Sequence, residues 1–225
     1  MKYVFNGTSI QNSRPSNMDS LLLKSGFIGT SNAMLAVVCD GVGSQTDGGY
    51  SSATAVKMLS HWFNNVNNKK NIGLAMRDAV LDINRHIASE AQKMNLETAT
   101  TLSALVLIED KYYITHIGDS RIYSYENGVL SLLTSDDLSE SGKLTGYIGK
   151  KQDVFMQYSE GEALYKTFII CSDGFYNRLQ VDVLVEEVKS WNKRPSDEQI
   201  YFLTQYVIER GEKDNISLAL VKIES

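Results

Sequence analysis

The sequence has few cysteines, prolines and histidines, and it contains no long hydrophobic run. Two cysteines and two prolines among 225 residues exclude a disulfide-stapled scaffold and a collagen-like or proline-rich chain. The longest apolar run, residues 33–39, is far shorter than the roughly 20 residues of a membrane-spanning helix. No apolar segment follows Lys2, so we expect neither a signal peptide nor a membrane partner. Cys39 and Cys171 each end an apolar run, which favours buried, reduced thiols in a cytoplasmic protein.

The charge balance is acidic, with 22 lysines and arginines against 27 aspartates and glutamates and a formal net charge of −5. Nucleic-acid binding requires a concentrated basic face, so we expect no nucleic-acid partner. No repeat, low-complexity tract or proline-rich linker divides the chain. We expect one domain over residues 1–225, and we expect it to be a monomer.

Short apolar runs predict strands at residues 33–39, 102–108, 112–117, 168–171 and 216–223. Hairpins are indicated around residues 109–111 and at Asn127-Gly128, because Asn-Gly is the strongest short-range hairpin signal. Apolar residues recur at three- and four-residue steps in three further segments, residues 53–63, 72–94 and 200–207. Ser196 is expected to cap the last of these helices. Because hairpin-linked strands and helices are segregated, the pattern predicts an α+β fold with antiparallel sheets.

Aspartates stand at one end of four predicted strands: Asp40, Asp119, Asp173 and Asp214. Three of them adjoin a glycine, which lets the backbone turn sharply and approach a ligand. If these strand ends converge, four carboxylates share one volume, where two like charges about 4 Å apart repel by about 4 kcal/mol. Such a cluster needs protons or hard cations such as Mg²⁺ or Mn²⁺. The alternative is that each pair of aspartate and glycine is an ordinary turn.

Carboxylate-bound cations suit phosphoryl chemistry, because they lower the pKa of a bound water and neutralise charge on phosphate oxygens. A phosphate site also favours a guanidinium, whose planar fork matches two phosphate oxygens. Arg14 is the candidate, since it lies in a polar loop at residues 11–19 before the first predicted core strand. The alternative is a solvated surface arginine.

The ordered set of motifs resembles that of the metal-dependent serine/threonine protein phosphatases of type 2C, the PPM family. In chain order the motifs are RPSNMD (14–19), VCDGVG (38–43), TT (100–101), GDSRIY (118–123), LTSD (133–136), CSDG (171–174) and DNIS (214–217). Each motif alone is weak, but seven in family order over nearly the whole chain are strong.

The resemblance implies a four-layer α-β-β-α sandwich, with two central antiparallel sheets flanked by helices, as a single type 2C catalytic domain. It implies hydrolysis of phosphoserine or phosphothreonine by direct attack of a water activated at a binuclear Mg²⁺ or Mn²⁺ centre. The implied partner is a phosphorylated protein, together with a cognate serine/threonine kinase pathway.

The resemblance also implies roles for individual residues. Asp40 would bridge the two ions, with the Gly41 carbonyl on the first. Asp173 and Asp214 would hold the second ion, and Asp119 with Asp173 matches the position of a third ion in bacterial-type members.

Two more residues complete the implied site: Arg14 would clamp the substrate phosphate, and Asp19 would act through metal-bound waters. The chain departs from the family pattern at Val42, where some members carry a histidine proposed as general acid, and at Met18, which replaces an acidic or amide residue. A flap subdomain of the family is reduced here to residues 137–148, so we expect a more open site.

A non-catalytic phosphoprotein-binding module on the same fold is the alternative function, favoured by these three departures. The retained aspartates and Arg14 favour the enzyme. Other phosphatase chemistries lack their motifs, since no arginine stands six positions after Cys39 or Cys171, and no D-x-D or P-loop sequence occurs. The three histidines show no zinc spacing and are interpreted as structural.

Overall fold

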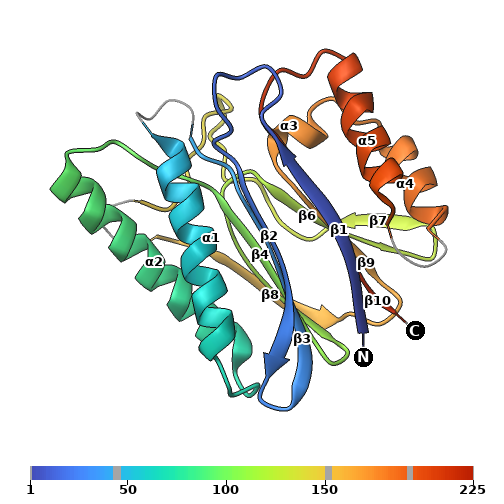
Figure 1. Cartoon of the computed structure of the whole chain (residues 1–225), viewed down its shortest axis with the longest axis horizontal. Helices are drawn as coiled ribbons and strands as arrows, with labels where there is room; N and C mark the ends of the chain where they lie inside the picture. The colour runs from blue at the N-terminus through green and yellow to red at the C-terminus, as the bar shows by residue number, and fades with distance from the viewer. Residues whose placement is uncertain (1, 43–46, 150–153, 192–194, 225) are drawn as a thin grey trace.

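The computed structural model describes residues 2–42, 47–149, 154–191 and 195–224. Two five-stranded antiparallel sheets pack face to face, with helices on the two outer faces (Figure 1). The first sheet has the order β1 (Lys2–Ile10), β10 (Ile216–Glu224), β9 (Thr167–Cys171), β6 (Arg121–Glu126) and β7 (Val129–Leu132). The second has the order β2 (Ser20–Ile28), β3 (Ser31–Cys39), β4 (Leu102–Ile108), β5 (Lys111–Ile117) and β8 (Gln157–Glu162).

Helices cover both outer faces of the sheet pair. The second sheet carries α1 (Gly48–Asn65) and α2 (Ile72–Met94), whereas the first carries α3 (Asp173–Tyr176), α4 (Val181–Lys189) and α5 (Asp197–Glu209) (Figure 1). The long helices are amphipathic: α2 buries Ile72, Met76, Val80, Ile83 and Ile87 at three- and four-residue steps. The expected four-layer α-β-β-α sandwich is therefore confirmed.

Strand β3 shows why the core strands are unbroken apolar runs in the sequence. Met34, Ala36 and Val38 pack into the cluster between the two sheets. Leu35 and Val37 point the opposite way and pack against α1 and α2. Because alternate side chains of a strand face opposite sides, a strand covered on both faces must be apolar at every position.

The five predicted core strands are present, and so are the two hairpins. Asn127 and Gly128 both have positive φ, as the tight turn between β6 and β7 requires. The predicted cap of α5 is also present, because the Ser196 side chain accepts a hydrogen bond from Gln199 N. Strands β1, β2 and β8 were not predicted, because they are edge strands with partly exposed, polar residues and lack a long apolar run.

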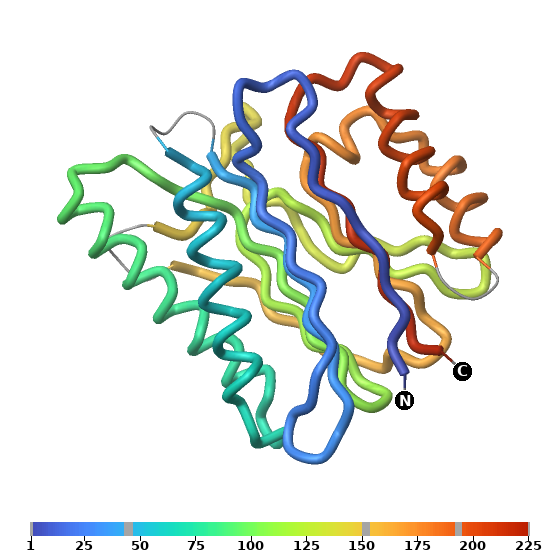
Figure 2. The backbone as a smooth tube through the Cα atoms, in the orientation of Figure 1, coloured from blue at the N-terminus to red at the C-terminus, as the bar shows by residue number. Residues whose placement is uncertain are grey.

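The hairpin topology brings the aspartate-bearing chain segments to one end of the sandwich. β3 and β9 end there and β10 begins there, while the turn that follows β5 leads into β6 at the same end. At the opposite end, Lys2 pairs with Glu224, so the first and last described strands lie side by side (Figure 2). Within the described residues, no helix is long and apolar enough to cross a membrane.

Candidate active site

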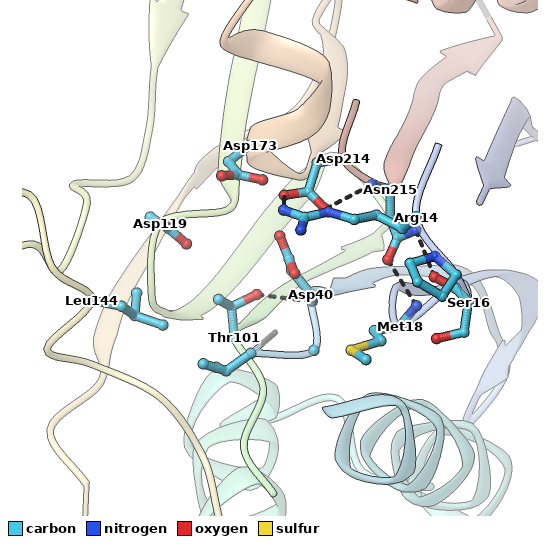
Figure 3. A pocket seen from close by; sticks show the side chains of 13 residues that line it. Arg14, Ser16, Met18, Asp40, Thr101, Asp119, Leu144, Asp173, Asp214 and Asn215 are labelled. Carbon is cyan, nitrogen blue, oxygen red and sulfur yellow. Dashed lines mark hydrogen bonds and ion pairs between the residues drawn. The ribbon is translucent and has the colours of Figure 1, made fainter. Parts of the chain in front are cut away.

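Four predicted aspartates and Arg14 line one cavity of about 410 Å³ at this end of the sandwich (Figure 3). The four carboxylates are those of Asp40, Asp119, Asp173 and Asp214. They come from both sheets: Asp40 follows β3, Asp119 lies in the turn between β5 and β6, Asp173 begins α3, and Asp214 precedes β10. Sequence segments far apart in the chain therefore supply one acidic pocket.

Backbone hydrogen bonds fix Asp40 at the floor of the cavity. Its amide donates to Thr101 Oγ1 at 3.0 Å, and its carbonyl accepts from Thr100 Oγ1 and from the Thr101 amide, both at 2.8 Å. Burial raises the pKa of the Asp40 carboxyl well above its usual value, and the charges of Asp19 and Asp173 raise it further. The paired threonines thus position Asp40, a role that the sequence analysis did not assign.

Gly41 also lines the cavity, and its position requires a glycine. A Cβ at Gly41 would lie 2.6 Å from backbone atoms of Gly48 and 2.7 Å from the Met18 carbonyl oxygen. The missing side chain lets three backbone segments meet beside Asp40. Gly43, the last residue of the second motif, lies outside the described residues.

Asp19 does not line the cavity but is buried beside it. Its Oδ2 accepts hydrogen bonds from Ser172 Oγ at 2.9 Å and from Ser217 Oγ at 2.7 Å. Its Oδ1 is buried without a hydrogen-bond partner among the described residues. Burial raises the Asp19 pKa to about 6, although the two serine hydroxyls lower it. A buried carboxylate oxygen without a partner is costly, so this atom suits a bound water or cation.

Asp119 and Asp173 are partly buried and lie near Asp40 in the cavity (Figure 3). Burial raises the Asp119 pKa to about 6, and the nearby charge of Asp173 adds to this effect. The pKa of Asp173 is also raised, first by burial and then by the charge of Asp214. The carboxylates therefore repel one another, as the sequence analysis expected of converging strand ends.

Arg14 binds Asp214 in a bidentate ion pair. Its Nε donates to Oδ1 at 2.8 Å, and its Nη2 donates to Oδ2 at 2.5 Å. Asn215 fixes the loop that carries Arg14: its Nδ2 donates to the Gln11 and Ser16 carbonyls, and its Oδ1 accepts from the Met18 amide. Asn215 belongs to the last of the seven motifs, DNIS (214–217), but this role was not predicted from the sequence.

The short segment at residues 137–148 contributes Leu144 to the cavity wall. Asp137 ties this segment to the turn that precedes Asp119, since its amide donates to the Gly118 carbonyl at 2.7 Å and its Oδ2 accepts from the Gly118 amide at 2.8 Å. Val42 lies at the cavity beside Gly41. That the shortened flap makes the site more open stays a prediction.

The two cysteines and His116 are buried, and their surroundings favour a structural role. Cys39 and Cys171 are free, buried thiols whose pKa is raised by burial, which argues against a nucleophilic thiolate. His116 is buried, with Nδ1 2.8 Å from Ser103 Oγ and Nε2 3.0 Å from the Gly118 carbonyl oxygen, and burial lowers its pKa. His116 therefore stabilises the turn that carries Asp119 through its contact with Gly118.

The donor chemistry of the cavity fits hard divalent cations, because the four aspartates that line it offer carboxylate oxygens as ligands. The unpartnered Asp19 Oδ1 and the raised pKa values of the aspartates also indicate a place for positive charge. Among the residues that the structure describes, however, no three His, Cys, Asp or Glu side chains form a ready-made metal site. One of the carboxylates is instead paired with Arg14.

Comparisons with known proteins identify the family and the fold of the chain. Residues 6–207 match the family described as Protein phosphatase 2C. A serine/threonine phosphatase of Listeria monocytogenes is 28% identical over 221 residues, which cover 87% of each chain. The solved structure of a serine/threonine phosphatase from Staphylococcus aureus superposes with a TM-score of 0.88 at 20% identity, covering 100% of this chain and 96% of that one. The catalytic domain of another such phosphatase, solved in complex with two manganese ions, has a TM-score of 0.84 at 21% identity and full coverage of both chains.

Proposed function

The chain belongs to the protein phosphatase 2C family, and on that basis we propose that it hydrolyses phosphoserine and phosphothreonine in proteins with the help of Mn²⁺ or Mg²⁺. The observation that carries this proposal is the cavity in which four aspartates and one arginine meet. An acidic pocket with a guanidinium at its edge suits a doubly charged cation and a phosphate together.

Three aspartates are the proposed ligands of two divalent cations, Asp40 for both ions and Asp173 and Asp214 for the second. Gly41 would contribute its carbonyl oxygen to the first, and Asp119 with Asp173 would hold a third. When bound, the cations supply a water of lowered pKa and neutralise charge on the phosphate. The pKa values of Asp40 and Asp119 are raised by burial and by neighbouring aspartates, so negative charge in the pocket is unfavourable without a cation.

The remaining residues act on the substrate and the water. Arg14 is half-exposed at the rim and presents two parallel N–H donors, the arrangement that binds two oxygens of a phosphate. Asp19 would accept a hydrogen bond from a site water at Oδ1, while Ser172 and Ser217 hold its other oxygen. The Val42 side chain cannot donate a proton, so the leaving serine or threonine oxygen would take its proton from a water or from another group.

We further propose that residues 1–225 act as one catalytic domain and as a monomer, because Arg14 and the four aspartates of one chain suffice to line the cavity. A serine/threonine kinase is the counterpart, because a phosphoester must be made before it is hydrolysed. The two free, buried thiols support a cytoplasmic location, where cysteines stay reduced.

The test is hydrolysis of p-nitrophenyl phosphate and of a phosphothreonine peptide, with Mn²⁺ and with a chelator. Wild type is compared with Asp173→Asn and with Asp182→Asn, the same chemical change at an exposed residue of α4. We expect metal-dependent turnover that is lost in Asp173→Asn and kept in Asp182→Asn. No turnover in any protein that still binds Mn²⁺ would instead support a phosphoprotein-binding module.

A further inference from the structure

We propose that Arg14 is an internal competitor for divalent cations: it binds Asp214 in the metal-free protein and reaches the phosphate only after a cation has displaced it. This inference rests on the proposed function. It adds an order to the binding events, in which the cation comes first and the phosphoprotein second.

The geometry of the ion pair supports this competition. Arg14 engages both carboxylate oxygens of Asp214, which is itself a proposed metal ligand. Among the described residues that line the cavity, Arg14 is the only basic one and faces four aspartates. The charges of Asp173 and Asp40 also act on the guanidinium and raise its pKa, after the dominant contribution of Asp214. The arginine therefore already neutralises part of the charge that a cation would neutralise.

A second arginine, Arg121, has a guanidinium that several contacts hold in place, and it serves as a comparison for Arg14. Arg121 also pairs with an aspartate, Asp136, but it lies 3.7 Å over the ring of Tyr176 and donates to the Tyr123 hydroxyl. Arg121 and Asp136 expose only 28% and 17% of their side chains. Arg14 and Asp214 expose 55% and 36%, and within the described structure the Arg14 guanidinium hydrogen-bonds to Asp214 alone. The Arg14 side chain is thus the one that can be released.

The backbone around Arg14 allows this release without moving the loop. Asn12 Nδ2 donates to the Glu212 and Asp214 carbonyls at 2.9 and 3.0 Å, and Asn215 binds the loop at three further points. These bonds do not involve the guanidinium. A cation on Asp214 would repel the guanidinium across a few ångströms. The side chain, which Figure 3 shows paired with Asp214, would then turn towards a phosphate that arrives in the same cavity.

The first test is Mn²⁺ binding by isothermal titration calorimetry, without substrate. Arg14→Gln removes the competitor and should bind Mn²⁺ about three- to tenfold more tightly than wild type, as expected for a partly exposed bidentate pair. Lys189→Gln removes an equal charge from the distant Lys189–Glu186 pair and should leave Mn²⁺ affinity unchanged. Equal or weaker Mn²⁺ binding by Arg14→Gln would overturn the competition.

The second test uses inorganic phosphate and metal-free protein. Asp214→Asn should release Arg14 without any cation, so it should bind phosphate at least about threefold more tightly than Asp119→Asn, which removes the same charge but no contact to Arg14. The gain should vanish in the double variant with Arg14→Gln. Equal phosphate affinities of the two single variants would contradict the inference.

These outcomes also separate the inference from the proposed function. If Arg14→Gln binds Mn²⁺ as wild type does, and wild type shows Mn²⁺-dependent hydrolysis, only the competition is overturned. The absence of both Mn²⁺ binding and hydrolysis would overturn the proposed function, and the competition with it.

Discussion

At the scale of single residues, the main feature of the site is a set of carboxyl groups with raised pKa values. Asp119 has a pKa of about 6 in the folded protein, raised by burial and by Asp173, against an unperturbed value near 3.9. The native state therefore binds more protons than the unfolded state between about pH 4 and about pH 6. The contribution of Asp119 to the free energy of unfolding therefore falls as pH rises through this window.

The Asp119→Asn variant tests this link between charge and stability. With a chelator present, it should melt at a higher temperature than wild type at pH 8, because one repelling carboxylate is gone. At pH 4 the two melting temperatures should differ little. Thermal melts followed by circular dichroism at both pH values measure the effect. An equal difference in melting temperature between the two proteins at pH 8 and at pH 4 would contradict this link.

Ser172 is a residue-scale support that acts through Asp19. Its buried hydroxyl donates to Asp19 Oδ2 and accepts from the Ser217 amide at 3.0 Å. Ser172→Ala would leave both partners less satisfied, so we expect a loss of about 1–2 kcal/mol in the free energy of unfolding and weaker Mn²⁺ binding. Urea denaturation and calorimetry measure the two effects. The exposed Ser190→Ala serves as control, and equal behaviour of both variants would contradict the role.

At the scale of elements, Asn215 joins the segment before β10 to the loop at residues 11–18. The residue is only 5% exposed, and its side chain makes three hydrogen bonds to that loop. Asn215→Ala should destabilise the protein by about 2 kcal/mol and raise KM for a phosphopeptide more than it lowers kcat, because Arg14 loses its fixed position.

Hydrogen exchange of residues 11–18 gives a direct measure of the same effect. Exchange there should accelerate in Asn215→Ala, while α2 keeps its protection. Asn68→Ala, in an exposed turn, is the matched control. An unchanged exchange rate of the loop would show that Asn215 is not its anchor.

The elements also show where sequence reasoning succeeds. Strands such as β3 and β4 are buried on both faces, so their apolar runs are unambiguous. The edge strand β8 has alternating half-exposed and exposed residues, including Glu160 and Glu162, and gives no such signal. The aspartates were predictable because each follows or precedes a core strand. The roles of Ser172 and Asn215 were not, because their partners lie about 150 to 200 positions away in the chain.

At the scale of the whole molecule, the acidic cavity sets stability against cation binding. Two sheets can bring four aspartates together only by burying their charges and setting them against one another, and both effects, burial first, raise the pKa values of Asp40 and Asp173. A cation that binds only the native state relieves this repulsion. At a concentration of about 100 times its Kd, such a ligand adds about 2.7 kcal/mol to the free energy of unfolding.

For a chain of this length, that gain corresponds to a rise of about 5–10 °C in Tm on addition of saturating Mn²⁺. Asp40→Asn removes a carboxyl whose pKa is raised well above its usual value, first by burial and then by the neighbouring aspartates. The variant should therefore melt at a higher temperature than wild type in chelator, and Mn²⁺ should raise its Tm little. Differential scanning calorimetry of both proteins, with and without Mn²⁺, measures the two shifts. If wild type shows no shift, or if Asp40→Asn gains as much as wild type, then the carboxylates of the two sheets do not share a cation.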